Sequence, residues 1–213
     1  DSDSTYATKV NLSVGDSPTN FTIADLDGDG DEDMIMSDND SYYVKVLYND
    51  GEGSFDSGTN FSLNDYSYTV TAGDLDHDGD LDIVVGISDN VSVLLNDGTG
   101  VLSAPADYSI GTVQNVIDVV TTDINGDGEL DIVAIDEYSK FYTMINNGDG
   151  TFGSPLATNT FDGPSAVDAG DLDNDGDVDL VLSSNTDYNI YVYKNNGDGT
   201  FSNHQGYENL GYF

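Results

Sequence analysis

Four acidic nine-residue segments have the residue types and spacing of a metal site. They read DLDGDGDED from Asp25, DLDHDGDLD from Asp74, DINGDGELD from Asp123 and DLDNDGDVD from Asp171. In each segment, side chains with a carboxylate or amide oxygen stand at positions 1, 3, 5 and 9, and a glycine stands at position 6. Alternate side chains of a curled loop can turn toward one cation, and glycine permits the sharp turn that this requires. We therefore predict one metal site in each segment.

The predicted ligands are the side chains at positions 1, 3, 5 and 9 and the backbone carbonyl at position 7, whose own side chain we expect to face solvent. The full set is Asp25, Asp27, Asp29, Asp31 and Asp33; Asp74, Asp76, Asp78, Asp80 and Asp82; Asp123, Asn125, Asp127, Glu129 and Asp131; and Asp171, Asp173, Asp175, Asp177 and Asp179. The carbonyl ligands within this set belong to Asp31, Asp80, Glu129 and Asp177. Asn125 replaces a carboxylate in the third segment, so we expect that site to be the weakest.

Calcium is the ion that this ligand chemistry favours. Ca²⁺ accepts a flexible shell of about six to eight oxygens, whereas Mg²⁺ requires a stricter octahedron and usually keeps several waters. Zn²⁺ would be expected to recruit His or Cys, and the chain contains no cysteine. An EF-hand is disfavoured, because its loop ends in a glutamate at position 12 between two helices. Here position 12 is Met36, Val85, Ala134 or Leu182, each within a predicted strand.

The charge balance also implies that cations are part of the folded protein. The chain has 41 acidic residues, four lysines and no arginine, which gives a formal net charge of −37. Such an excess destabilises a compact state through self-repulsion. It also argues against nucleic-acid binding, phosphoryl transfer and adsorption to anionic lipid, all of which need basic residues. No apolar run approaches the roughly 18 residues of a membrane-spanning helix, so we expect no direct membrane insertion.

The acidic segments belong to a repeat that covers the chain. They begin 49, 49 and 48 residues apart, and a second motif keeps the same register: NDGEGSF from Asn49, NDGTGVL from Asn96, NNGDGTF from Asn146 and NNGDGTF from Asn195. Short apolar runs flank each acidic segment, an aromatic or β-branched run follows, and the second motif provides a tight reversal into a fourth strand. Four antiparallel strands in each period of about 50 residues are typical of a propeller blade.

The combination of AGDLDHDGDLDIVVG (Ala72–Gly86) with NNGDGTF resembles the FG-GAP/VCBS-type repeats of integrin-alpha-like β-propellers. The resemblance extends over essentially the whole chain. It implies that each acidic segment connects the first and second strands of a blade and holds one Ca²⁺. It also implies an extracellular or cell-surface setting, in which such propellers serve adhesion, ligand binding or secreted carbohydrate-active proteins.

We therefore expect an all-β fold, a single β-propeller domain over residues 1–213 with four four-stranded antiparallel blades. The repeats span about 20–63, 68–112, 117–160 and 165–213, and residues 5–14 are a candidate outer strand that closes the ring. Propellers of this family commonly have about seven blades, whereas this chain has only four repeats, a number still within the known range for propellers. A closed four-bladed ring is our preferred prediction. The alternatives are an eight-bladed ring shared by two chains in a dimer, and a fragment of a longer array.

The functional prediction is a calcium-stabilised, extracellular, non-catalytic module that binds carbohydrate or protein ligands at the cell surface. Only His77 and His204 could act as near-neutral bases, and we expect both to have surface or structural roles. Fourteen tyrosines favour binding, because exposed rings can stack on sugars or contact protein. The candidates are Tyr42, Tyr43, Tyr66, Tyr68, Tyr188 and Tyr191, although those on third strands are expected to pack between blades. The alternatives are a propeller of a secreted polysaccharide-degrading enzyme, accessory or catalytic, and a purely structural segment.

Overall fold

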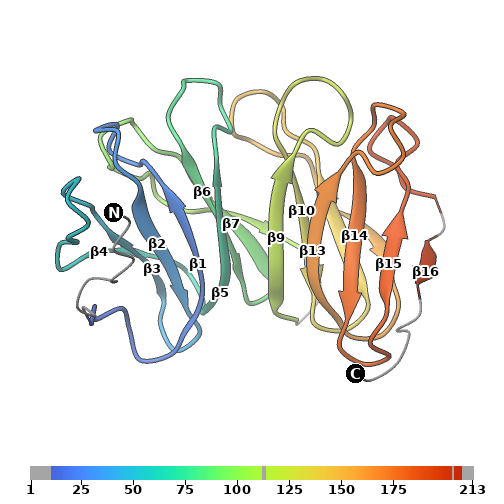
Figure 1. The fold of residues 1–213 in the computed structure, drawn as a ribbon, viewed down its shortest axis with the longest axis horizontal. Coiled ribbons are helices and arrows are strands. Elements are labelled where there is room, and N and C mark those ends of the chain that lie inside the picture. The colour runs from blue at the N-terminus through green and yellow to red at the C-terminus, as the bar shows by residue number, and fades with distance from the viewer. Residues whose placement is uncertain (1–10, 112–113, 203, 208–213) are drawn as a thin grey trace, which may run out of the picture.

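The computed structural model describes residues 11–111, 114–202 and 204–207, and within them the chain folds into four antiparallel sheets (Figure 1). Each sheet is a meander of four consecutive strands and forms one blade. Blade 1 contains β1 (Pro18–Ala24), β2 (Asp33–Asp38), β3 (Tyr43–Leu47) and β4 (Thr59–Ser62). Blade 2 contains β5 (Ser67–Gly73), β6 (Asp82–Ile87), β7 (Asn90–Leu94) and β8 (Ala106–Ser109).

The other two blades repeat this arrangement. Blade 3 contains β9 (Val116–Thr122), β10 (Asp131–Asp136), β11 (Lys140–Met144) and β12 (Leu156–Asn159). Blade 4 contains β13 (Pro164–Gly170), β14 (Asp179–Ser184), β15 (Ile190–Tyr193) and β16 (Gln205–Tyr207). The predicted all-β fold of four four-stranded blades is thus confirmed. No helix in the described residues is long and apolar enough to cross a bilayer.

The hydrophobic core consists of three clusters, and each lies between two successive blades. Val70 of β5 packs with Ile35 and Val44 of blade 1, while Val119 of β9 packs with Val84 of blade 2. The third cluster joins residues of blades 3 and 4 in the same way. A second strand such as β6 is buried on both faces over its whole length, which explains why its sequence, DIVVGI, is almost continuously apolar. The blades are therefore held together face to face, as in a propeller.

The four blades form an open arc, so the preferred prediction of a closed four-bladed ring is wrong. The inner strands stand in the order β1, β5, β9 and β13, each beside the next, and blades 1 and 4 lie at opposite ends of the molecule (Figure 1). With the inter-blade packing seen here, four blades do not turn far enough to meet. Of the predicted closing strand at 5–14, residues 5–10 lie outside the described residues, and residues 11–14 are not in a strand.

The meander gives each blade two different ends. The loops between the first and second strands, which contain the acidic segments, share one end with the N-x-G-x-G loops between the third and fourth strands. We call this the acidic-loop end, and it is uppermost in Figure 1. The opposite end, here the hairpin end, carries the turns between second and third strands. Asp136 shows how one of these turns is fixed: its carboxylate accepts the backbone N–H groups of Tyr138, Ser139 and Lys140 at 2.9–3.1 Å.

Candidate metal-binding loops

The acidic loops share one backbone conformation. Position 6 has a left-handed φ in every loop, from 93° at Gly30 to 98° at Gly176, which only glycine adopts without strain. Position 4 is also left-handed, including where it is not glycine: His77 has φ 60° and Asn174 has φ 61°. The loops therefore keep their shape when their sequence varies, as a common structural requirement at each loop would demand.

The carboxylates at positions 1, 3 and 5 converge. In the first, second and fourth loops, one oxygen from each of these three side chains lies within 4.8 Å of the other two. The groups are Asp25, Asp27 and Asp29; Asp74, Asp76 and Asp78; and Asp171, Asp173 and Asp175. In the third loop, Asn125 Nδ2 donates a hydrogen bond to Asp127 Oδ2 at 2.8 Å, so the amide satisfies part of the charge there.

These groups fit a hard cation. Asp27 Oδ1 and Asp74 Oδ1 are buried, and neither has a hydrogen-bond donor within the described residues. A buried carboxylate oxygen without a donor is costly unless a cation meets it. Burial, together with the neighbouring Asp78 carboxylate, raises the pKa of Asp76 above its ordinary value. The acidic triplets can therefore bind a metal ion, which would neutralise charges that now repel one another.

The position-9 carboxylates tie the acidic loop to the N-x-G-x-G loop of the same blade. Asp82 is fully buried and accepts the backbone N–H of Leu75 at 2.8 Å and that of Asn96 at 2.8 Å, one on each oxygen. Equivalent pairs of bonds are made by Asp33, Asp131 and Asp179. Each oxygen keeps a second lone pair. Metal coordination by position 9 stays a prediction, but its role in joining two loops is a structural observation.

Burial also perturbs the acidity of position 9. Desolvation raises the pKa of Asp82 to about 6, against the lowering effect of its two backbone hydrogen bonds, and the carboxylates of Asp76 and Asp78 raise it further. Asp131 behaves in the same way, with its pKa raised to about 6 chiefly by burial. The acidic loop thus crowds negative charge against a buried strand, and the electrostatic cost falls when a cation is present.

The position-7 side chains are half-buried rather than free in solvent. In each blade this side chain lies against the first glycine of the N-x-G-x-G loop, as Asp80 does beside Gly98. Glu129 also reaches the preceding blade, where its Oε2 lies 2.6 Å from His77 Nδ1. His77 is thus exposed, as expected, but has a partner in the next blade. Coordination through the position-7 carbonyls stays a prediction.

An asparagine clamp joins the acidic loops across blades, and sequence reasoning missed it. Asn96 Nδ2 donates to the Leu26 carbonyl of the preceding blade at 2.7 Å and to the Leu81 carbonyl of its own blade at 3.1 Å. Asn146 and Asn195 repeat the arrangement, with inter-blade bonds of 2.7 Å to the carbonyls of Leu75 and Ile124. The signal was the invariable first asparagine of the second motif, which we interpreted only as a turn residue.

The predicted tyrosines do not form one surface. Tyr42 and Tyr188 are exposed at the hairpin end, and Tyr42 stacks on the half-buried Tyr66 with ring centroids 4.4 Å apart. Tyr43 and Tyr68 are half-buried on strands. Tyr191 is buried and stacks on Phe161 at 3.8 Å. We missed Tyr138, which is exposed in the hairpin between β10 and β11.

The chain belongs to the family of FG-GAP-like repeat proteins. The family model matches residues 25–85, 81–134, 123–182 and 171–211, so each match begins at or near an acidic loop. Four copies of this repeat build the propeller-type fold described above. No curated protein has significant sequence similarity to the chain.

Solved structures share the fold. A lectin from Agrocybe aegerita, described as specifically recognising non-reducing terminal N-acetylglucosamine, is 24% identical with a TM-score of 0.62, over 86% of this chain and 50% of that one. BBS1N in complex with ARL6DN is 12% identical with a TM-score of 0.64, over 92% and 58%. The V. cholerae biofilm matrix protein Bap1 is 22% identical with a TM-score of 0.54, over 91% of this chain and 28% of that one. The chain thus spans about half the length of the first two.

Proposed function

We propose that the chain is a calcium-stabilised, non-catalytic binding module of an extracellular protein, with a glycan or protein as its ligand. The acidic-loop end has the structural task of holding Ca²⁺ and joining blades. The hairpin end presents aromatic side chains to solvent. The observation that carries the proposal is the difference between the two ends of the same blades, with converging carboxylates at one end and exposed tyrosines at the other.

The donor chemistry of the acidic loops supports calcium. Carboxylate oxygens converge from positions 1, 3 and 5 in three of the loops. Extracellular calcium modules have dissociation constants of about 0.1–1 mM, and we expect a similar affinity here. An extracellular location agrees with that range, because free calcium outside cells is high enough to fill such sites. It also agrees with a surface on which acidic residues greatly outnumber lysines.

Exposed tyrosines at the hairpin end support ligand binding. The Tyr42–Tyr66 stack lies between the turn after β2 and the loop before β5, and Asp65 lies beside it. Tyr138 and Tyr188 occupy the corresponding turns of blades 3 and 4, with 57% and 61% of their surface exposed. Aromatic faces next to carboxylates are typical of carbohydrate sites, where sugar C–H groups stack and hydroxyls donate. The lectin among the similar structures makes glycans the first ligand class to test.

The experiment is a glycan array followed by titration of the tightest ligand, both in calcium. Tyr42→Ala should weaken binding at blade 1, and Tyr188→Ala binding at blade 4, each by about 1–3 kcal/mol for a stacking residue at the centre of its own site. Tyr207→Ala is the matched control, because Tyr207 is also exposed but lies on the edge strand β16. Binding that survives the Tyr42 and Tyr188 variants would contradict the proposed site. Release of reducing sugar from a polysaccharide would favour the enzymatic alternative.

A further inference from the structure

The two ends of the arc expose the same kinds of blade face that pack against each other between blades in its interior. Blade 1 has no blade before it and blade 4 has none after it within the described residues. We call the outward side of blade 1 the leading face, defined by Phe21, Ile23, Asn49 and Gly53. The outward side of blade 4 is the trailing face, defined by Leu172, Val181, Ile190 and Val192. Both can be compared, residue by residue, with the three interior junctions.

The leading face carries an exposed residue whose counterparts in the other blades are buried between two blades. Four residues before each acidic loop, the inner strand carries Phe21, Val70, Val119 or Val167. The three valines are 4–5% exposed, because each packs into the blade before it, whereas Phe21 is 63% exposed. Ile23, on the same side of β1, is 59% exposed. A large aromatic residue and an isoleucine side by side in water are the kind of patch that marks an interface.

The trailing face shows the complementary pattern. At position 2 of the acidic loop, Leu26, Leu75 and Ile124 are at most 1% exposed under the following blade, while Leu172 is 50% exposed. Ile190 of β15 is also 50% exposed, although its counterparts in the other blades are fully buried. Leu172 and Val181 line a shallow pocket with Asp168, Ala169 and Gly170 on this side of blade 4.

The hydrogen-bonding groups of the junction are also divided between the two faces. Asn49 Nδ2 makes the bond within its own blade, to the Glu32 carbonyl at 3.1 Å, but among the described residues it has no partner in another blade. The Leu172 carbonyl is the equivalent of the carbonyls that accept the inter-blade bonds, and no described side chain donates to it. One face therefore holds the donor of a missing asparagine clamp and the other holds its acceptor.

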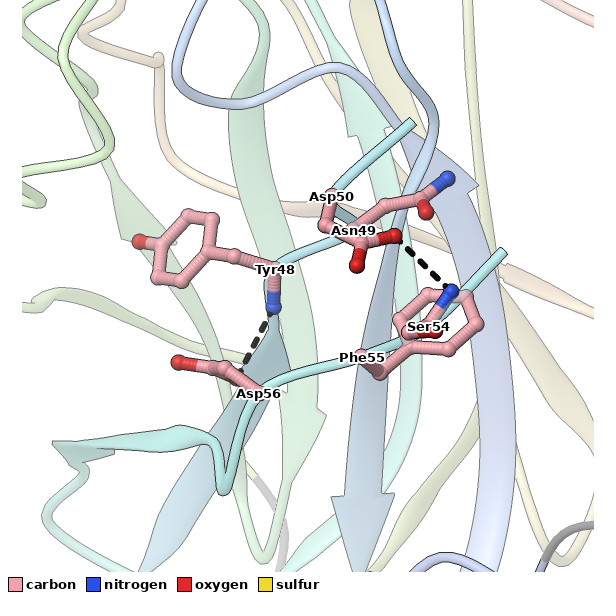
Figure 2. A pocket seen from close by; sticks show the side chains of 6 residues that line it. All are labelled: Tyr48, Asn49, Asp50, Ser54, Phe55 and Asp56. Carbon is pink, nitrogen blue, oxygen red and sulfur yellow. Dashed lines mark hydrogen bonds between the residues drawn. The ribbon is translucent and has the colours of Figure 1, made fainter. Parts of the chain in front are cut away.

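A glycine of the leading face is also exposed where the equivalent glycines of the other blades are covered by the preceding blade. Gly100, Gly150 and Gly199 are buried, and a Cβ at each would meet the preceding blade, for example Tyr48 at Gly100. Gly53 is exposed and has nothing within 4 Å of that position. Figure 2 shows how this loop is presented: the side chains of Tyr48, which contacts blade 2, and Asn49 extend in opposite directions from the end of β3. Asn49 thus points away from blade 2, on the side where a preceding blade would stand.

We infer that a second copy of this chain docks head to tail, with the leading face of each copy on the trailing face of the other. Phe21 and Ile23 would pack on Leu172, Val181 and Ile190, and Asn49 Nδ2 would donate to the carbonyl of Leu172 of the second copy. Each chain has one face of each kind, so two copies satisfy all four faces and close one ring of eight blades. Pairing of like faces would place donor against donor and leave both clamps incomplete.

Two further observations favour this occupant. The junction is already an established interface of the molecule, used three times between blades of this sequence. The described residues before β1, 11–17, leave the apolar part of the leading face free: Lys45 Nζ of β3 donates to the Ser13 carbonyl at 3.0 Å, while Phe21 and Ile23 are exposed.

The first test is the mass of the whole chain in calcium, by sedimentation velocity over a wide range of concentrations. We expect a single species of twice the chain mass. A monomer throughout would overturn the inference, whatever other segment or partner covers the faces. A mass that keeps rising with concentration would contradict closure, because open head-to-tail growth gives filaments.

The second test uses one charge on each face. Phe21→Asp and Leu172→Asp should each abolish the dimer, and Asn49→Ala should weaken it. Val101→Asp is the matched control, because Val101 is 58% exposed on blade 2, away from both faces. Cooperative melting that still depends on calcium would show that each variant folds, with a lower melting temperature expected where the dimer is lost.

Mixing the two charged variants separates head-to-tail docking from pairing of like faces. In a mixed dimer, the intact trailing face of the Phe21→Asp chain meets the intact leading face of the Leu172→Asp chain, so one junction is restored. We expect the mixture to dimerise where neither variant does alone. Loss of the dimer with only one of the variants, and no recovery on mixing, would contradict the head-to-tail arrangement.

Discussion

The first three acidic loops and the fourth have nearly the same sequence but different surroundings. Leu26, Leu75 and Ile124 place the first three under the following blade, and an asparagine of that blade is bonded to each loop. In the fourth loop, positions 1–6 are exposed, and Lys194 Nζ lies 2.5 Å from Asp173 Oδ2. The motif alone thus fixes the loop conformation, while the next blade decides whether the loop also supports a junction. We expect calcium to be worth more to the fold at covered loops.

The largest expected effect is that of removing calcium altogether. A site at a hundredfold excess of calcium over its Kd adds about 2.7 kcal/mol to the free energy of unfolding, so the three covered sites together amount to roughly 8 kcal/mol. Chelation should therefore lower the melting temperature strongly, or unfold the chain. Thermal melts in calcium and in chelator measure this difference, with magnesium in place of calcium as the control. Identical curves would contradict a structural role for the ion.

Single ligand variants sharpen the contrast between covered and open loops. Asp27→Asn removes a half-buried carboxylate of the first loop, whose Oδ1 is buried, and in calcium it should cost about 2–3 kcal/mol, most of the linkage of one site. The same substitution at Asp173 in the open loop should cost less than about 1 kcal/mol, because an exposed loop can open locally without separating blades. Urea unfolding in calcium measures both values. Equal costs would remove the distinction between the two kinds of loop.

In chelator, the sign at Asp27 should reverse. Without calcium, the Asp27 carboxylate faces those of Asp25 and Asp29, so replacing it with a neutral amide removes repulsion and should stabilise the chain. Asp173→Asn should show no such gain, since the carboxylate that it removes is paired with Lys194. The same urea series in chelator tests this.

The asparagine clamp gives a third comparison, between an interior junction and the leading face. Asn146→Ala breaks an inter-blade bond and leaves the Leu75 and Leu130 carbonyls without this donor, which should cost about 1–3 kcal/mol. Asn49→Ala also loses the bond from the Gly51 N–H, as Asn146→Ala loses that from Gly148, but its only lost carbonyl bond is within its own blade, so it should cost the free chain about 1 kcal/mol or less. Both are measured below the concentration at which chains associate. If Asn49→Ala lowered the free energy of unfolding as much as Asn146→Ala, the inter-blade bond of Asn146 would not be contributing to stability as expected.

The smallest expected effect is a pH dependence at a junction away from the loops. Asp118 of β9 accepts the N–H of Val167 in blade 4 at 2.9 Å and lies near the carboxylate of Asp168. Burial raises the pKa of Asp118, and Asp168 adds to this. The contribution of Asp118 to the free energy of unfolding is therefore fully present at pH values below the ordinary carboxyl pKa. It is lost as the pH rises through the raised pKa of the folded state.

The variant that isolates this effect is Asp118→Asn. The unfolding free energy of the unaltered chain, relative to this variant, should fall as pH rises from about 4 to 7. Urea unfolding of both chains at several pH values measures the difference, in which charge effects common to both cancel. If this difference in unfolding free energy did not change with pH, it would contradict a raised pKa of Asp118 in the folded state.

The sequence predicted the blades well because turn residues mark the ends of the strands in every repeat. The runs Thr69–Gly73 and Ile83–Gly86, for example, lie within β5 and β6, on either side of an acidic loop. The strands are short and β-branched, and turn residues mark both ends, so local signals were sufficient. Ring closure was mispredicted because it depends on the angle between blades, which arises from packing and leaves no local signal.

The candidate site was predictable in its ligands but not in its connections. The spacing of Asp25, Asp27 and Asp29 indicated convergence, and the carboxylates do converge. The inter-blade bond of Asn96 joins residues 70 positions apart, and the contact of His77 with Glu129 joins residues 52 apart. Neither follows from a pattern within one repeat. Only the register between neighbouring blades brings such residues together.

The most direct test of the account is a calorimetric titration of the calcium-free chain with Ca²⁺, with bound calcium counted by elemental analysis. The account predicts four ions per chain, with the site that contains Asn125 the weakest of the three covered sites. Asn125→Asp should strengthen that site and leave the total unchanged. No heat of binding and no bound calcium would contradict the claim that the acidic loops hold the ions that stabilise the propeller.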